Sequence, residues 1–252
     1  MIFDGHSDIF SDVRYKREAG ETQVLKNHHL DRLRKGGIGG ACFVIWADTY
    51  NGHAPKDEME AIVKGIKGEM AETKEFVLIH NVEELKAAEA AGKFAILLGI
   101  EGLAGIGEDL SKIDELYDLG ARHAMLTWNE ENALATGVKG DPNRGVTDLG
   151  KQAIKKLQEK KMILDVSHIN EKSFWDVIDL ATGPILASHS NAKALASAAR
   201  NLTDDQLRAI RDTNGLVGLN AFGDFISDNK AEQDVDHLVN HATYIADKVG
   251  VE

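Results

Sequence analysis

Residues Phe94–Gly102 read FAILLGIEG, and this stretch does most to decide the fold. It is a short run of apolar residues without polar alternation, and it stops at an acid followed by a glycine. Such a run is typical of a strand that is buried on both faces of a parallel sheet. Similar runs predict the other strands: Ile2–Phe3, Ala41–Ala47, Ala124–Thr127, Met162–Val166, Pro184–Ser188 and Leu216–Leu219.

Amphipathic segments separate these runs, with apolar residues at helical spacing. The predicted helices are Lys56–Glu75, Val82–Ala91, Asp109–Leu119, Leu149–Lys160, Asn170–Leu180, Leu207–Arg211 and Gln233–Val249. Thr203 and Gln206 have the spacing of a capping box before the helix at 207–211. Strands that alternate with helices in this way indicate a parallel α/β fold.

Two architectures fit this alternation: an open doubly wound sheet and a TIM-type (β/α)₈ barrel. A dinucleotide-binding doubly wound sheet would carry G-x-G-x-x-G in its first strand-to-helix turn. Residues 37–42 read GIGGAC, which lacks the last glycine and precedes a strand, so this possibility fails. Because no linker, repeat or low-complexity segment interrupts the chain, we predict a single domain over residues 1–252.

The residues best suited to chemistry stand at the carboxyl ends of four predicted strands. They are His6, Asp8, Glu101, His168 and His189. In a barrel these strand ends converge on the catalytic face. Because side chains alternate along a strand, His6 and Asp8 should point the same way. Asp4 has the same parity, and we expect it to bond either a metal-binding imidazole from one layer below or another residue of the barrel floor.

Three imidazoles and two carboxylates at one face would suit two divalent cations. The absence of a thiolate favours Zn²⁺, Mn²⁺ or Co²⁺ over soft metals. Two such ions at about 3.5–4 Å need a bridging ligand. Glu101 is the best candidate, because His6 and Asp8 belong on one side and His168 and His189 on the other.

Other chemistries are less well supported. No G-x-S-x-G elbow occurs, and the serines that precede His168 and His189 are sequence neighbours that should not face them. Cys42 lies within an apolar strand and should be buried and inert. His237 and His241 are four residues apart without the glutamate of H-E-x-x-H, so we expect both on a solvated helix face.

As a spaced set, the motifs resemble the renal (membrane) dipeptidase family of zinc metallopeptidases over nearly the whole chain. These motifs are Asp4-Gly5-His6-Ser7-Asp8, Ile100-Glu101-Gly102, Asp165-Val166-Ser167-His168, Ser188-His189-Ser190, Arg200-Asn201-Leu202 and the stretch Leu30–Gly37. The resemblance implies a (β/α)₈ barrel that hydrolyses dipeptides, some with a C-terminal D-residue.

The resemblance also implies roles for individual residues. His6 and Asp8 would bind one zinc, His168 and His189 the other, and Glu101 would bridge them. A metal-bridging hydroxide would attack the peptide carbonyl, with a carboxylate moving the proton. Arg200 would lie near the substrate, where its guanidinium suits the free carboxylate of a dipeptide. The resemblance further suggests a homodimer.

The chain departs from the family pattern in two places. Leu126-Thr127-Trp128-Asn129 carries tryptophan where the family has a histidine that holds the substrate carbonyl, so we expect Trp128 to line the substrate site in another way. The last predicted helix should lead into an eighth strand with a proton-shuttling aspartate, but the sequence stops at Glu252. We therefore expect a truncated barrel whose activity depends on what supplies that strand.

Composition excludes several functions. The 252 residues carry 29 Lys and Arg against 41 Asp and Glu, a net charge of −12, which disfavours a nucleic-acid partner. No apolar stretch is long enough to span a membrane, and no leader is recognisable. One cysteine excludes an intrachain disulfide. We therefore expect a cytoplasmic protein. Two alternatives stay open: another amidohydrolase-type barrel acting on N-acyl amino acids or lactones, and a catalytically silent metal-binding barrel.

Overall fold

The computed structural model describes residues 1–47 and 52–251, in which strands alternate with helices. The strands are β1 (Ile2–Ser7), β2 (Ile38–Trp46), β3 (Phe76–Leu78), β4 (Phe94–Glu101), β5 (His123–Met125), β6 (Ile163–Asp165), β7 (Ile185–Ala187) and β8 (Leu216–Val217). The α-helices are α1 (Ile9–Glu18), α2 (Asp31–Lys35), α3 (Pro55–Glu72), α4 (Val82–Ala90), α5 (Lys112–Leu119), α6 (Asp148–Glu159), α7 (Glu171–Leu180), α8 (Asp204–Asp212), α9 (Gly223–Ile226) and α10 (Val235–Val249). Short π or 3₁₀ turns are η1 (Leu25–Leu30), η2 (Ala104–Ile106) and η3 (Lys230–Glu232).

The strands form two sheets, with the orders β1-β2-β4-β3 and β5-β6-β7-β8. In the first sheet all pairs are parallel, and in the second β7 pairs in parallel with β6 and β8. The parallel α/β fold predicted from the sequence is therefore confirmed. Closure of the strands into a barrel stays a prediction.

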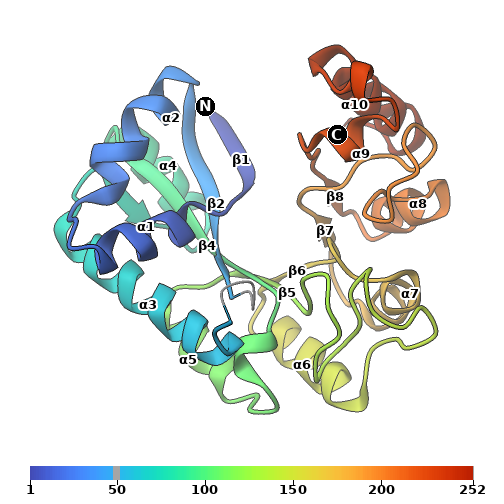
Figure 1. Cartoon of the computed structure of the whole chain (residues 1–252), viewed down its shortest axis with the longest axis horizontal. Coiled ribbons are helices and arrows are strands. Elements are labelled where there is room, and N and C mark those ends of the chain that lie inside the picture. The colour runs from blue at the N-terminus through green and yellow to red at the C-terminus, as the bar shows by residue number, and fades with distance from the viewer. Residues whose placement is uncertain (48–51, 252) are drawn as a thin grey trace. The chain divides into compact units, whose positions relative to one another are not determined.

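The chain divides into two compact units. Unit 1 comprises Met1–Ala124 with Lys160–Met162, and it contains the first sheet. Unit 2 comprises Met125–Glu159 and the chain from Ile163 onward, and it contains β6, β7 and β8. Figure 1 draws unit 1 mainly in blue to green and unit 2 in yellow-green to red. The single domain over 1–252 stays a prediction, and Glu252 lies outside the described residues.

The centre of unit 1 is the pair β2 and β4, which α1, α3 and α4 flank (Figure 1). Residues 41–45 of β2 are fully or almost fully buried. Gly99 of β4 is needed for this packing, because a Cβ there would lie 2.6 Å from His123 Nδ1 and 2.7 Å from Cys42 Sγ. The register pairs Trp46 with Glu101, so the two strands end together and present Glu101 at the sheet edge.

The predicted strands are all present, with small differences in their bounds. β3 was not predicted, because a three-residue strand has no periodicity to detect and its pairing with β4 comes from distant residues. The prediction of burial on both faces holds for β2 and β4 but is wrong for two terminal strands. In β1, Ile2 is 58% exposed, and in β8, Leu216 is 64% exposed. Both lie at an end of their sheet.

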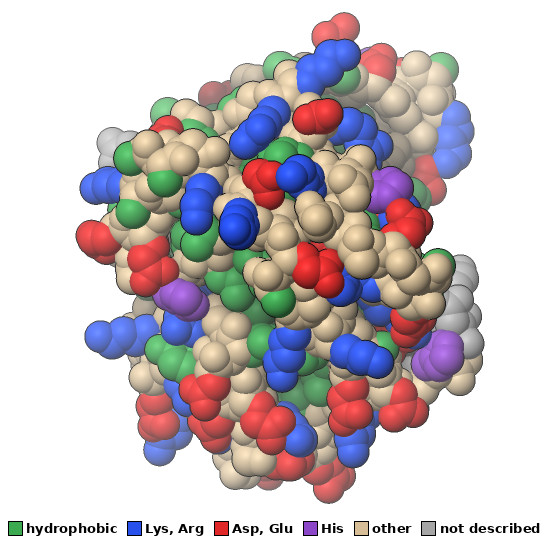
Figure 2. Space-filling view, turned by 90° about the vertical axis from the view of Figure 1, so that its left-hand side faces the viewer, with side chains coloured by type: hydrophobic (Ala, Val, Ile, Leu, Met, Phe, Trp, Pro, Cys, Tyr) green, Lys and Arg blue, Asp and Glu red, His purple; other side chains and the backbone are tan. Residues whose placement is uncertain are grey.

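The described residues contain no helix long and apolar enough to cross a membrane. On the face that Figure 2 presents, Lys and Arg side chains lie interspersed with Asp and Glu.

The capping box before α8 is confirmed and gives a stability prediction. Thr203 Oγ1 accepts a hydrogen bond from Gln206 N at 3.2 Å, and Gln206 Oε1 accepts one from Thr203 N at 2.9 Å. Thr203→Ala removes one of these bonds and should lower the free energy of unfolding by about 1 kcal/mol. Urea denaturation followed by circular dichroism measures this loss. Thr243→Ala, at an exposed threonine inside α10, is the control and should cost less.

Candidate metal centre

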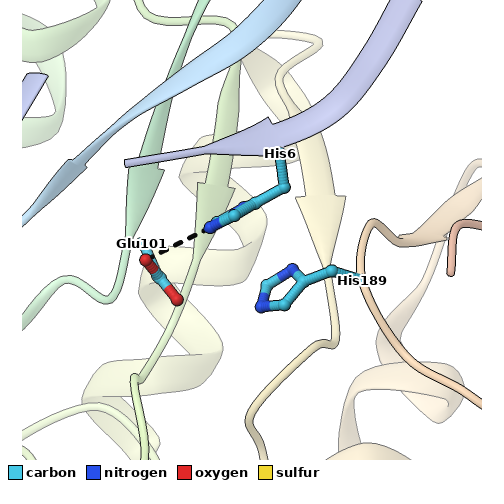
Figure 3. A group of neighbouring side chains, drawn as sticks. All are labelled: His6, Glu101 and His189. Carbon is cyan, nitrogen blue, oxygen red and sulfur yellow. Dashed lines mark ion pairs between the residues drawn. The ribbon is translucent and has the colours of Figure 1, made fainter. Parts of the chain in front are cut away.

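The first group of candidate residues lies in unit 1, where β1 and β4 end. His6 lies in β1 and Glu101 is the last residue of β4, and the two side chains point toward each other (Figure 3). His6 Nε2 lies 3.3 Å from Glu101 Oε2 and 3.7 Å from Asp8 Oδ1. The His6 and Glu101 side chains are buried, whereas that of Asp8 is 53% exposed. One imidazole and two carboxylates therefore meet in unit 1.

Asp8 joins this group in a different way from the one predicted. β1 ends at Ser7, and Asp8 is the N-cap of α1, so strand alternation does not set its direction. Asp4 contacts the backbone of the same strand. Its Oδ1 accepts a hydrogen bond from the His6 backbone N–H at 3.2 Å. Asp4 thus supports the backbone that carries His6.

The charges in this group shift the pKa of each member. Burial acts to lower the pKa of His6, but hydrogen bonds to Asp8 and Glu101 outweigh it and raise that pKa to about 10. Burial raises the pKa of Glu101 to about 7, against the opposing effect of His6. For Asp8, desolvation acts to raise the pKa, but the hydrogen bond and charge of His6 together with a hydrogen bond to Glu101 lower it. A cation that binds this group must therefore compete with protons.

The second group lies in unit 2, where the loops after β6 and β7 bring His168 and His189 together. Their Nε2 atoms are 2.8 Å apart. His168 Nδ1 lies 2.9 Å from Asn129 Oδ1, an acceptor, and this contact favours the tautomer with the proton on Nδ1. His189 Nδ1 lies 2.8 Å from Ser188 Oγ, a group that can accept from it in the same way. In that tautomer Nε2 is the ring nitrogen that can bind a metal ion.

The two predicted substrate-binding residues lie beside this pair in unit 2. The Trp128 ring centroid is 6.0 Å from that of His168, and Lys139 Nζ is 5.7 Å from the Trp128 ring. Arg200 is only 7% exposed. Its Nη2 lies 3.4 Å from the His189 carbonyl oxygen and its Nη1 3.4 Å from Ser190 Oγ. An aromatic ring and a buried cation therefore border the histidine pair.

Two expectations about other residues are wrong. Ser188 Oγ does reach His189 Nδ1, because the chain leaves the strand after β7 and the alternation rule no longer applies. His241 is fully buried, not on a solvated face. Its Nδ1 accepts from the Ala192 backbone N–H at 3.1 Å, and Nε2 lies 2.8 Å from the Ile226 carbonyl oxygen. Cys42 is buried, as predicted.

The residues that orient the histidines were not predicted from the sequence. Asn129 is next to Trp128 in sequence but is 39 residues from His168, so only the fold reveals their contact. Asp165 belongs to a quoted motif but was given no role. A buried-strand pattern that ends in an acid is the signal that could have marked it.

The donor set fits divalent metal ions. It offers imidazole nitrogens and carboxylate oxygens without a thiolate, the combination that suits zinc, manganese and cobalt. The 2.8 Å approach of His168 Nε2 to His189 Nε2 brings two of these imidazole nitrogens to one place.

Comparison with known proteins places the chain among peptidases. A profile of the family described as membrane dipeptidase matches residues 1–252. An uncharacterised protein from the PQQ-III 3′ region of Acinetobacter calcoaceticus is 30% identical over 282 residues, covering 98% of this chain and 90% of that protein.

Two solved structures are similar to the chain throughout its length. One is a metallopeptidase from Rhodobacter sphaeroides, crystallised with a phosphinate mimic of the dipeptide L-Ala-D-Ala. It has a TM-score of 0.88 at 25% identity, with 99% of this chain and 82% of that chain covered. The other, described as dipeptidase AC, a metallopeptidase, gives the same values.

Proposed function

This chain belongs to the membrane dipeptidase family, and from that premise we propose that it hydrolyses dipeptides, including those with a C-terminal D-residue, at a binuclear zinc centre. Membership makes the protein a metallopeptidase and therefore a hydrolase. The observation that carries the proposal is the convergence of His168 and His189 at their Nε2 atoms. The pairing of His6 with Glu101 at another pair of strand ends supports it.

We assign the metal ligands as the family resemblance implies. His6 and Asp8 would hold one ion, His168 and His189 the other, and Glu101 would bridge the two. Zinc fits the donor set best, and Mn²⁺ or Co²⁺ could replace it. When bound, such a pair supplies an activated water and polarises the peptide carbonyl.

The chain's own residues would position the substrate around these ions. Arg200 is a buried guanidinium with donors suited to the free carboxylate of a dipeptide. Trp128 would provide an apolar wall beside His168. Glu101 is the proposed catalytic carboxylate, because it is the buried acid in contact with His6. The bound dipeptide mimic in the Rhodobacter structure supports a dipeptide as the substrate class.

A comparison of four substrates tests this function. The zinc-loaded protein should hydrolyse L-Ala-D-Ala and L-Ala-L-Ala, and should be much slower on an N-acetyl amino acid and on a lactone. Faster turnover of the N-acyl or lactone substrate would favour another amidohydrolase-type reaction. Metal binding without any turnover would favour a silent barrel.

Metal removal should abolish the activity reversibly. We expect a chelator to remove about two metal equivalents per chain and to reduce dipeptide hydrolysis to background. Added Zn²⁺, Mn²⁺ or Co²⁺ should restore it, with two equivalents required. Elemental analysis during the titration measures the ratio. Full activity at one equivalent would contradict the binuclear centre.

We further propose a cytoplasmic homodimer. The family resemblance suggests the dimer, and the single buried cysteine is typical of a reducing compartment. Analytical ultracentrifugation tests the oligomeric state.

A further inference from the structure

Asp165, the last residue of β6, has a carboxylate buried in unit 2 with 1% exposure. Its Oδ1 accepts a hydrogen bond from Ser167 N at 2.7 Å. Ser188 N, at the end of the next strand, lies 3.3 Å from both carboxylate oxygens. One buried anion therefore joins the ends of β6 and β7 through backbone amides. Burying this charge is costly unless such donors compensate it.

The two amides have a notable place in the sequence. Ser167 immediately precedes His168, and Ser188 immediately precedes His189. Each bond thus fixes the backbone one residue before a candidate metal ligand. The Asp165 carboxylate is the common acceptor of both.

The backbone at His168 needs such support. His168 has φ +75°, in the left-handed region that non-glycine residues rarely adopt. A conformation of this kind costs about 1–3 kcal/mol and persists only where neighbouring contacts hold it. On its carboxyl side, Val138 N donates to the His168 carbonyl oxygen at 2.9 Å. On its amino side, the hydrogen bond from Ser167 N to Asp165 also holds the backbone in place.

We propose that Asp165 is a positioning residue that sets the 2.8 Å approach of His168 and His189 and so prepares them to share one metal ion. This inference rests on the proposed function, because it assumes that both imidazoles are ligands. Asp165 itself touches neither the metal nor the substrate in this role. It acts through the two backbone amides.

The test compares Asp165→Asn and Asp165→Ala by Co²⁺ titration of the metal-free protein. Asparagine keeps Oδ1 as an acceptor but loses the charge, whereas alanine loses both. We expect Co²⁺ affinity at one of the two sites to fall about 10-fold in the asparagine variant and further in the alanine variant. The visible absorption of bound Co²⁺ should change as well. In the metal-free variants, the imidazole ¹⁵N shifts of His168 and His189 should move.

Glu69→Gln is the matched control. Glu69 is also fully buried and accepts from Leu25 N at 2.8 Å, Thr73 Oγ1 at 2.9 Å and Arg17 Nη1 at 3.0 Å, but it belongs to α3 in unit 1. Its loss should lower the thermal midpoint without changing Co²⁺ affinity or the two imidazole shifts. If Asp165→Ala fails to fold, the asparagine variant carries the test.

His168→Ala distinguishes a failure of the positioning role of Asp165 from a failure of the proposed function. If His168→Ala loses one Co²⁺ while Asp165→Asn binds as the wild type does and leaves the imidazole shifts unchanged, the positioning role is overturned and the proposed function stands. If His168→Ala and His189→Ala both retain two Co²⁺ ions with wild-type spectra, the ligand assignment is wrong, and the role of Asp165 falls with it.

Discussion

Glu101→Ala should release both metal ions together and reduce kcat/KM for a dipeptide by about 10³-fold or more. A bridging carboxylate is shared by both ions, so its loss weakens each of them, whereas loss of a terminal ligand weakens one. The binuclear centre must also activate the attacking water, and a metal can lower the pKa of bound water from 15.7 to about 7. Elemental analysis and steady-state kinetics on the same preparation measure the two losses.

Two companion variants make this experiment specific. Glu101→Gln keeps the size of the side chain but not its charge, and should behave like the alanine variant. Glu115→Ala, at an exposed residue of α5, should leave metal content and activity unchanged. Retention of two full equivalents in Glu101→Ala would show that Glu101 does not bridge. In the metal-free protein, Glu101→Ala should also lower the pKa of His6, because it removes one of the two carboxylates that raise it.

The parts of the fold that sequence predicted well are those with strong local signals. β4 was predicted because an unbroken apolar run ends at Glu101 and Gly102, and Gly102 adopts φ +85° where the strand stops. The start of α8 was predicted because a capping box involves only four neighbouring residues. In both places local preference and tertiary structure agree.

The elements that sequence missed depend on distant contacts. α1 has few buried residues, among them Arg14, whose Nη2 pairs with Glu58 Oε2 of α3 at 3.1 Å. An arginine on the packed face of a helix weakens the apolar periodicity by which helices are detected. β3 depends on its pairing with β4 in the same way.

For the candidate residues, the sequence indicated their places in the chain better than their contacts. Strand-end positions pointed to His6, Glu101, His168 and His189, because that placement follows from the order of strands alone. Asp8 was placed on a strand although it begins a helix. Loop conformations such as the positive φ of His168 have no signature in residue type, so the contacts that they create could not be predicted.

Arg200→Ala should raise KM for dipeptides by on the order of 100- to 1000-fold, with a smaller change in kcat. A buried guanidinium that binds a carboxylate through two charge-assisted hydrogen bonds is typically worth about 2–5 kcal/mol. This interaction involves the free carboxylate and not the scissile bond, so its loss acts mainly on substrate binding.

The form of the substrate makes the Arg200 test specific to carboxylate recognition. A dipeptide amide lacks the carboxylate anion. Wild type should therefore bind the amide about as poorly as Arg200→Ala binds the free dipeptide. Arg200→Ala should discriminate little between the free dipeptide and its amide. Arg200→Lys keeps the charge but loses the bidentate geometry, so its KM for the free dipeptide should lie between those of wild type and Arg200→Ala.

Because Arg200 also contacts the His189 carbonyl oxygen, metal content must be measured beside the kinetics. If the variant keeps both metals and still prefers the free dipeptide over its amide as strongly as wild type does, another group binds the carboxylate. In that case Lys139 is the next cation to replace, because its Nζ lies 5.7 Å from the centroid of the Trp128 ring.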